Sequence, residues 1–199
     1  MSDSLFTIGY SHHSFDDFVQ LLQLHGITAL ADVRSHPTSR LVQFKYAHLS
    51  SELSVHGIDY VFLGKELGAR RDERAAYEDD QVQYEKVAQL PLFLQGLERL
   101  KVGISKYRLA LMCAEKEPLD CHRTILICHK LRDWPIQIQH ILSDGTLEEH
   151  ATTEQRLVQK MEVSRTLFEP DLSDEELMQR AYQKRAGEIA YRLPEPDED

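Results

Sequence analysis

The sequence predicts an α/β fold, in which a mainly parallel central sheet of about five strands carries helices on both faces and is followed by a C-terminal helical appendage. Short runs rich in β-branched and aromatic residues alternate with amphipathic stretches, which indicates β–α–β crossovers. The run at residues 27–33 is apolar almost throughout, as is typical of a parallel strand buried on both faces. With 42% hydrophobic residues among 199, the chain can bury a core of its own.

The N-terminal residues predict a strand followed by a helix. Residues 5–9 are rich in strand-forming side chains and end at a glycine. Ser14 is a suitable N-cap, and Asp16 and Asp17 complement the helix dipole in the first turn. Gly26 is suited to end this helix ahead of the strand at residues 27–33.

The same alternation continues towards the C-terminus. It predicts further strands at residues 58–63, 107–112 and 135–142. It also predicts helices at residues 46–56, at 77–100 with an interruption before Pro91, and directly after Asp120. The last predicted helix, at residues 173–192, has a serine cap and early acids. We therefore expect an α/β domain at 1–150, a helical appendage at 151–192 and a disordered tail at 193–199.

The charge balance restricts the function. A net charge of −10 and a pI near 5.5 argue against a sequence-independent nucleic-acid binder, which needs a basic face. Much of the acid lies in separate patches, so a nucleic-acid-processing role confined to a local cleft stays open. The sequence leaves the oligomeric state open, with Trp134 beside Pro135 as a candidate interface residue.

The expected location is the cytoplasm, without a membrane partner. No run approaches the roughly 20 apolar residues of a membrane span. The N-terminus lacks the basic and apolar segments of a signal peptide. Three cysteines are few for a disulfide scaffold and favour a reducing compartment.

Four polar stretches each follow a predicted strand, and they begin at Tyr10, Asp32, Gly64 and Cys113. The connection rules of parallel sheets bring the carboxyl ends of such strands to one edge, where ligands bind. We therefore expect these stretches to meet in one site.

The stretch at residues 113–123 is the densest in chemistry. Asp120 is expected to cap a helix that begins at Cys121, so that the Cys121 thiol lies at the positive end of the helix dipole. His122 and Arg123 beside it should lower the pKa of that thiol. The spacing therefore favours Cys121 as a nucleophilic or redox cysteine. The alternative is that these are small semi-buried residues without chemistry.

The neighbouring residues have expected roles of their own. Cys113 would act as a resolving or assisting thiol, with Glu115 beside it. Cys128 lies two helical turns after Cys121 among apolar residues and is interpreted as core. His122 or Asp32 would handle protons.

Metal binding is the main rival use of this loop. Cys113, Glu115, Cys121 and His122 are all of ligand type, but Cys-x7-Cys-His matches no standard zinc spacing. Adjacent residues on a helix also point about 100° apart. We therefore expect no metal. Walker, dinucleotide and CxxC motifs are absent from the sequence, and no cofactor is expected.

Arginines supply the expected binding groups for an anion. Arg34, Arg40 and Arg123 would form a fork for a phosphate or carboxylate, with hydrogen bonds from Tyr10 and Ser11. Asp32 would either orient a histidine or hold Arg34 or Arg123 in an ion pair. An anionic, even nucleotide-like, substrate is thus compatible with the acidic chain.

At these residues the sequence resembles the domain of unknown function 488 family. The motifs TIGYS, DVRSHPTSR, GIDYVFLGKELG, LMCAEKEPLDCHR, HILSDG and AYQKRAGEIAY carry the resemblance, in order along nearly the whole chain. The resemblance implies a single α/β domain whose two signature cysteines fall on Cys113 and Cys121. It implies no established reaction. A looser likeness to rhodanese-like sulfurtransferases is one of fold, and fold does not imply function.

The sequence therefore favours a thiol-dependent enzyme acting on a small anionic or nucleotide-like substrate. The alternatives are a sensor that binds a metal or ligand without turnover, and a nucleic-acid-processing protein that uses the same cleft.

Overall fold

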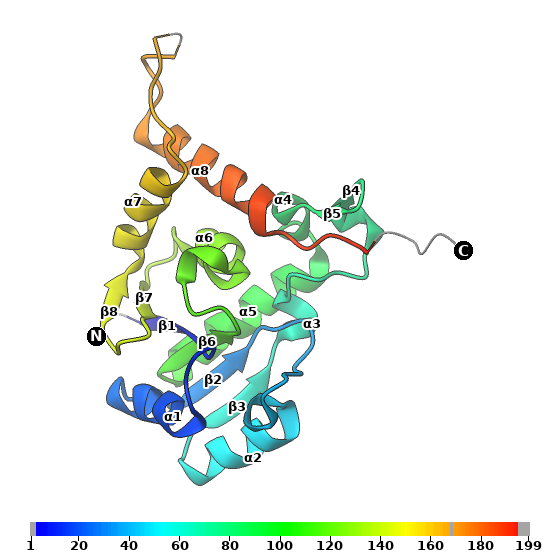
Figure 1. Cartoon of the computed structure of the whole chain (residues 1–199), viewed down its shortest axis with the longest axis vertical. Helices are drawn as coiled ribbons and strands as arrows, with labels where there is room; N and C mark the ends of the chain where they lie inside the picture. Colours follow the sequence, from blue (N-terminus) through cyan, green and yellow to red (C-terminus); the bar gives the residue numbers. More distant parts are fainter. Residues whose placement is uncertain (1–2, 168, 195–199) are drawn as a thin grey trace.

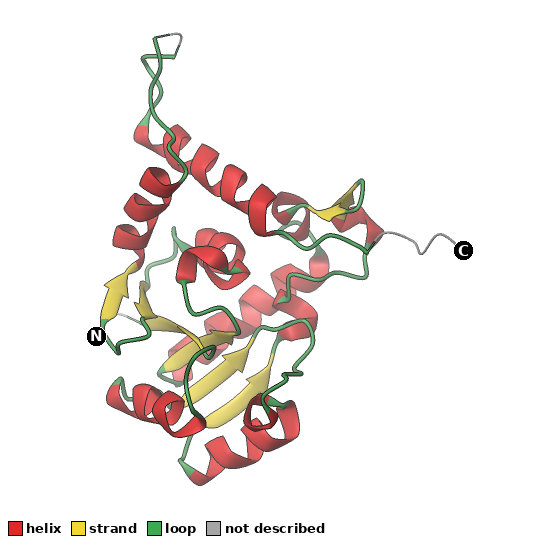
Figure 2. Ribbon diagram, viewed as in Figure 1, coloured by secondary structure: helices red, strands yellow, loops and turns green. Residues whose placement is uncertain are grey.

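The protein, seen here in a computed structural model that describes residues 3–167 and 169–194, has the predicted α/β fold. Its main sheet has six strands in the order β3-β2-β6-β1-β7-β8 (Figure 2). Five strands are parallel, and β8 pairs antiparallel with β7. The strands are β1 (Ser4–Gly9), β2 (Ala29–Asp32), β3 (Asp59–Phe62), β6 (Leu109–Cys113), β7 (Gln137–Ile141) and β8 (Leu147–Glu149).

Helices cover both faces of this sheet, as predicted (Figure 1). Alternate residues of β1 point to opposite faces, so Phe6 and Ile8 enter one core cluster and Leu5 enters the other. The first cluster packs under α1 (Phe15–Leu24), η1 (Val42–Phe44) and α2 (Tyr46–Val55). The second packs under α5 (Pro91–Lys106), the π-helical turn η4 (Arg123–Cys128) and α6 (His129–Leu131).

The register brings the ends of the central strands together. Gly9 at the end of β1 lies opposite Cys113 at the end of β6. The following loops remain bonded, because the backbone nitrogen of Tyr10 donates to the Cys113 carbonyl and that of Val33 donates to the Met112 carbonyl, both at 3.1 Å. The loops after β1, β2 and β6 therefore meet at one edge, as the sequence predicts.

Glycine permits the closest of these approaches. A Cβ atom at Gly9 would lie 1.9 Å from the Glu115 carbonyl oxygen. A Cβ atom at Gly64, which begins the short helix α3 (Gly64–Leu67), would lie 1.9 Å from the Arg34 carbonyl oxygen. Any side chain at either position would push two site loops apart.

The prediction of a helix at residues 77–100 is wrong for the first part of this range. A hairpin of β4 (Tyr77–Glu78) and β5 (Gln81–Val82) occupies it, preceded by η2 (Arg74–Ala76) and followed by α4 (Tyr84–Val87). Asp79 has a φ of 50°, which a helix does not allow. The predicted interruption before Pro91 is confirmed, since α5 begins at this proline.

After residue 142 the structure has two elements that the sequence did not predict and one that it did. Strand β8 and helix α7 (His150–Lys160) were not predicted. Helix α8 (Asp174–Ile189) was predicted. Ser173 and Glu176 form its capping box. Leu157 and Tyr182, from α7 and α8, belong to the core cluster that also contains η4.

The chain then runs back along the hairpin. The backbone nitrogen of Val82 donates to the Tyr191 carbonyl at 2.9 Å, and that of Leu193 donates to the Asp80 carbonyl at 2.8 Å. Of the tail predicted to be disordered, residues 195–199 lie outside the described residues. No helix within the described ranges has the length and apolarity needed to cross a bilayer.

Candidate functional site

A cavity of about 340 Å³ opens where the strand-end loops meet. Its size is at the lower end of ordinary ligand pockets, which span about 300–1,000 Å³. The walls come from the loops after β1, β2, β3 and β6, from α4 and from the segment after α8. They include Tyr10, Arg34, Arg70, Tyr84, Cys113 and Tyr191.

Cys121 occupies the N-cap position of its helix, one residue before the first helical position that was predicted for it. Asp120 ends the 3₁₀ turn η3 (Pro118–Asp120) and forms ion pairs with Lys160 at 2.8 Å and Arg185 at 2.5 Å. Cys121 is extended, and its sulfur accepts the backbone N–H of Arg123 at 3.5 Å, as an N-cap side chain does. The thiol, not Asp120, therefore occupies the cap, because Asp120 is held by cations outside the loop.

The imidazole of His122 lies between the two cysteines. Its Nδ1 atom is 3.7 Å from the Cys113 sulfur and 3.8 Å from the Cys121 sulfur. Its Nε2 atom is 3.0 Å from the carbonyl oxygen of Val33. Because a carbonyl only accepts, Nε2 carries hydrogen, and Nδ1 is the nitrogen that faces the two thiols.

The surroundings assign the negative charge to Cys121. Burial raises the pKa of the Cys121 thiol, but the hydrogen bond from Cys113 and the charges of Arg123 and His122 outweigh burial and hold it well below its ordinary value. The hydrogen bond to Cys121 and burial raise the pKa of Cys113 well above its ordinary value. Burial lowers the pKa of His122, but the Cys121 thiolate outweighs this and raises it. The expected state is a thiolate–imidazolium pair beside a neutral thiol.

Arg123 is fully buried and holds the cysteine loop from behind. Its guanidinium donates to the carbonyl oxygens of Glu115 at 2.5 Å and Lys116 at 3.2 Å, and to the hydroxyl of Thr7 at 3.3 Å. Arg123 is also absent from the cavity wall, so it does not present the guanidinium to a substrate as the sequence predicted. Arg123 fixes the loop and supplies positive charge to Cys121.

Asp32 forms the ion pair with Arg34 that the sequence left as one of its alternatives. Its carboxylate accepts from Arg34 Nη2 at 2.6 Å, from Arg34 Nε and from the hydroxyl of Tyr60 at 2.7 Å. Arg34 Nη1 donates to the carbonyl of Phe44 at 3.0 Å. Asp32 thus positions Arg34 and its loop.

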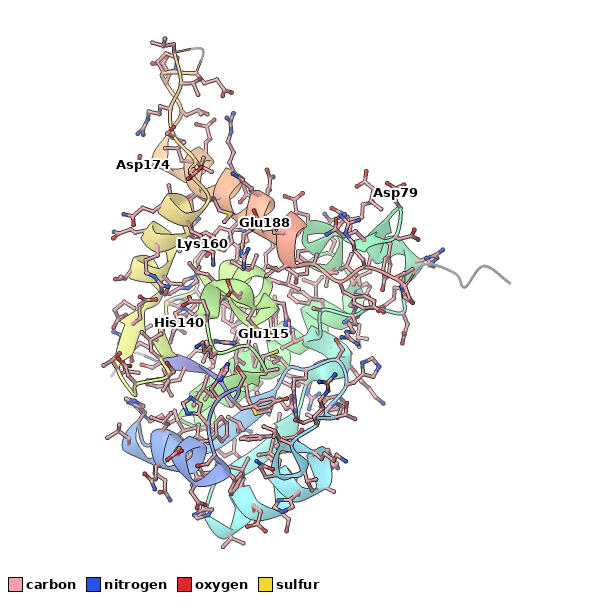
Figure 3. The ribbon with its side chains drawn as sticks, viewed as in Figure 1. Asp79, Glu115, His140, Lys160, Asp174 and Glu188 are labelled. Carbon is pink, nitrogen blue, oxygen red and sulfur yellow. The ribbon has the colours of Figure 1, made fainter. Side chains whose placement is uncertain are left out.

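Glu115 and Tyr84 both line the cavity beside the thiols. Burial, then the charge and hydrogen bonding of Cys121, raise the pKa of Glu115. Burial, then the charges of Cys121 and Cys113, raise the pKa of Tyr84. In Figure 3, Glu115 lies in the middle of the molecule, between the sheet and α6. Tyr84 therefore retains its proton, and the Glu115 carboxyl holds a proton more tightly than an ordinary glutamate does.

The remaining predicted residues have different positions. Tyr10 lines the cavity, stacks on Phe44 with ring centroids 4.3 Å apart and donates to the Ser39 hydroxyl at 3.3 Å. Ser11 contributes its backbone nitrogen to the Ala114 carbonyl at 3.0 Å. Arg40 is exposed and is not part of the cavity wall. The structure therefore does not form the three-arginine fork.

Sequence reasoning missed Tyr84, Arg70 and Tyr191. Tyr84 lay in a segment expected to be continuous helix, and Tyr191 lay in the predicted appendage. Arg70 was available as a signal, because it belongs to the polar stretch after β3 that was expected to reach the site.

Cys113, Cys121 and His122 also form a set of metal-ligand type, with one ligand atom from each residue within 4.8 Å of the others. A tetrahedral zinc ion needs sulfur and nitrogen ligands about 3.6 Å apart, given its usual bond lengths. The observed 3.7 and 3.8 Å are close to this. The objection that neighbouring helical residues diverge does not hold, because Cys121 is extended and precedes the helix.

No curated protein and no solved structure matches the chain significantly. The family described as Domain of unknown function DUF488 matches residues 14–129, more than half of the chain. The matched range contains both cysteines, His122 and Arg123 and ends before Tyr191.

Proposed function

This chain belongs to the DUF488 family, and we propose that it is a thiol-dependent enzyme acting on a small anionic or nucleotide-like substrate. The observation that supports this most is the position of His122 Nδ1, within 3.8 Å of both cysteine sulfurs. A base within reach of a thiol, itself oriented by a third group, is the arrangement that activates a cysteine nucleophile. Here the orienting group is the Val33 carbonyl.

We assign the nucleophile to Cys121, because its surroundings stabilise the thiolate. Cys113 lines the cavity and donates its proton towards Cys121, so it is the assisting or resolving thiol. His122 takes and returns the proton. Glu115, with its raised pKa, is a suitable general acid for a leaving group. Three free cysteines are consistent with the reducing cytoplasm, where we place the reaction.

Alkylation by iodoacetamide across pH, read for each cysteine by mass spectrometry, tests this proposal. Labelling of Cys121 should rise with pH around a midpoint well below about 8.5, the value of a free thiol. Cys121 and Cys128 are both buried, but the pKa of Cys121 is lowered and burial raises that of Cys128, so Cys128 should stay unlabelled at the pH where Cys121 reacts and serves as an internal control. Midpoints at or above about 8.5 for both site cysteines would contradict the proposal.

Cys121→Ser provides the matched variant. A serine hydroxyl can accept the same N–H of Arg123, so the cap and the fold should be kept. The low-pH labelling should disappear with any turnover. Loss of folding in this variant would instead indicate that the cysteine is structural.

A metal-binding sensor is the second candidate, and the three ligand atoms within 4.8 Å of one another favour it. The bond from His122 Nε2 to Val33 is the kind of outer contact that orients a metal-bound histidine. The cavity would supply the fourth position. Stoichiometric zinc in the purified protein, lost in Cys113→Ala but retained in Cys128→Ala, would favour the sensor over the enzyme.

A further inference from the structure

The cavity contains one arginine that is free to meet an anion. Two arginines line it, Arg34 and Arg70. Arg34 is engaged by Asp32 and by backbone carbonyls. Within the described part of the chain, the Arg70 guanidinium has a ring contact but no carboxylate partner.

The backbone on both sides of Arg70 is held in place. Its own nitrogen donates to the Ser35 hydroxyl at 2.8 Å. The next residue, Arg71, is buried and bonds the carbonyls of Lys65 and Glu66 at 2.9 and 3.0 Å. Arg71 also forms an ion pair with Glu73 at 2.7 Å. The position of Arg70 at the cavity is therefore fixed before a ligand arrives, which lowers the entropic cost of binding.

Tyr191 holds the guanidinium itself. Its ring lies 4.8 Å from Arg70 Cζ, a cation–π distance. A ring face supports a guanidinium without using its N–H donors, so these remain available for a ligand. Tyr191 is in turn held by the bond from Val82 to its carbonyl.

The acidic groups on the cavity wall leave the positive charge of Arg70 uncompensated. Asp120 is paired with Lys160 and Arg185. Glu115, the other acid on the wall, forms no ion pair with Arg70 among the described residues.

We propose that Arg70 binds an oxyanion group of the substrate, a carboxylate, sulfonate or phosphate, and that Tyr191 is its positioning residue. This inference rests on the proposed thiol chemistry, and it specifies the charged group that the substrate must carry. The C-terminal segment, outside the range that matches the family, thereby contributes to substrate selection.

Two alkylating agents of nearly equal shape test the inference. Iodoacetate carries a carboxylate and iodoacetamide a neutral amide, so the ratio of their labelling rates at the site thiol measures the preference for an anion. We expect Arg70→Gln to lower this ratio roughly five- to tenfold, the effect of losing a charge-assisted hydrogen bond. The iodoacetamide rate should change less than about twofold. An unchanged ratio in Arg70→Gln would overturn the inference.

Matched variants distinguish a specific effect of Arg70 from a general effect of positive charge. Arg74→Gln removes the same charge from an exposed residue that is not on the cavity wall and should leave the ratio unchanged. Tyr191→Ala should lower the ratio, while Tyr191→Phe, which keeps the ring, should restore it. An equal fall in Arg74→Gln would count against a specific site.

A second measurement does not depend on the thiols. Phenylglyoxal modifies arginine side chains, and inorganic phosphate should slow its reaction with Arg70 but not with Arg74, as read by mass spectrometry. Protection of Arg70 without any thiol labelling would support the anion site and reject the thiol enzyme. Absence of protection would overturn the anion site whatever the thiols do.

Discussion

The Nε2 atom of His122 donates to the carbonyl oxygen of Val33 across 3.0 Å, joining residues 89 positions apart in the sequence. The loop after β2 thus fixes the tautomer of a histidine that belongs to the helix after β6. The bond leaves Nδ1 directed at both sulfurs, so a backbone group determines which ring nitrogen faces the thiols.

We expect His122→Gln to raise the pKa of Cys121, because the variant removes a neighbouring opposite charge that stabilises the thiolate. The labelling rate follows the thiolate fraction, so its midpoint should move to higher pH and the rate at pH 7 should fall. The measurement is the iodoacetamide pH profile of Cys121. His36→Gln, an exposed residue at the same cavity, is the control and should leave the midpoint unchanged. Equal shifts in both variants would argue against the pair.

Replacement of Arg123 tests its role behind the loop. Arg123→Gln should lower the free energy of unfolding by about 2–5 kcal/mol, because the buried carbonyls of Glu115 and Lys116 lose a charged donor. Urea denaturation measures this as a shift in midpoint. Arg40→Gln, at an exposed arginine, should stay within about 0.5 kcal/mol of the wild type. A similar loss in both variants would mean that Arg123 has no special structural role.

The sequence predicted most of the framework because periodicity reports burial directly. The apolar run at residues 27–33 and the capped helix at Phe15–Leu24 both have local causes, and both are present. The convergence of the strand-end loops also followed, since the topology of parallel strands leaves few alternatives.

The contents of the site depended on contacts that are not local. The alternation of residues cannot reveal that Arg123 turns inward to two carbonyls while Arg70, in another loop, faces the cavity. The cap was misjudged by one residue because Asp120 pairs with Lys160 and Arg185, which are distant in sequence. The hairpin at Tyr77–Val82 was missed because two-residue strands have no measurable period.

Gly9→Ala tests the close approach of two site loops. The added Cβ would lie 1.9 Å from the Glu115 carbonyl oxygen, so backbone must move. We expect a loss of about 1–3 kcal/mol in unfolding free energy, as for other overpacked sites, measured by urea denaturation. Gly187→Ala is the control, and its expected effect on the unfolding free energy has the opposite sign. Its Cβ meets nothing within 4 Å in helix α8, so it should stabilise by about 0.5–1 kcal/mol. Equal effects of the two changes would contradict the packing.

A chain of buried hydrogen bonds runs from Arg123 away from the site. Arg123 Nε donates to the Thr7 hydroxyl, and Thr7 lies 2.8 Å from His140 Nδ1. His140 Nε2 lies 3.0 Å from His150 Nδ1, and His150 Nε2 lies 3.3 Å from the Tyr182 hydroxyl. Tyr182 donates to Glu154 at 3.0 Å. Each group in the chain donates one hydrogen bond, and all of these bonds run in the same direction, so both histidines are neutral. A proton added to either histidine would place two hydrogen-bond donors opposite each other.

This chain predicts a fall in stability at mildly acidic pH. Burial, then the charges of His129 and Arg132, lower the pKa of His150 to about 4. Burial, then the charge of His150, lowers that of His140 well below its usual value. Between pH 6.5 and 4 these two histidines bind more protons in the unfolded chain than in the folded one, so their contribution to stability rises with pH across this window and is lost as pH falls. His150 alone contributes about 3 kcal/mol of this change.

Urea denaturation at pH 7, 5.5 and 4.5 measures the effect. His150→Gln should flatten the slope between pH 6.5 and 4, because glutamine does not titrate, while lowering stability at pH 7 through the interrupted chain. His36→Gln, at an exposed histidine, should leave both the slope and the stability at pH 7 unchanged. An equal slope in His150→Gln and in the wild type would show that His150 is protonated as readily in the folded protein as in the unfolded chain, and would contradict hydrogen bonds that run in one direction.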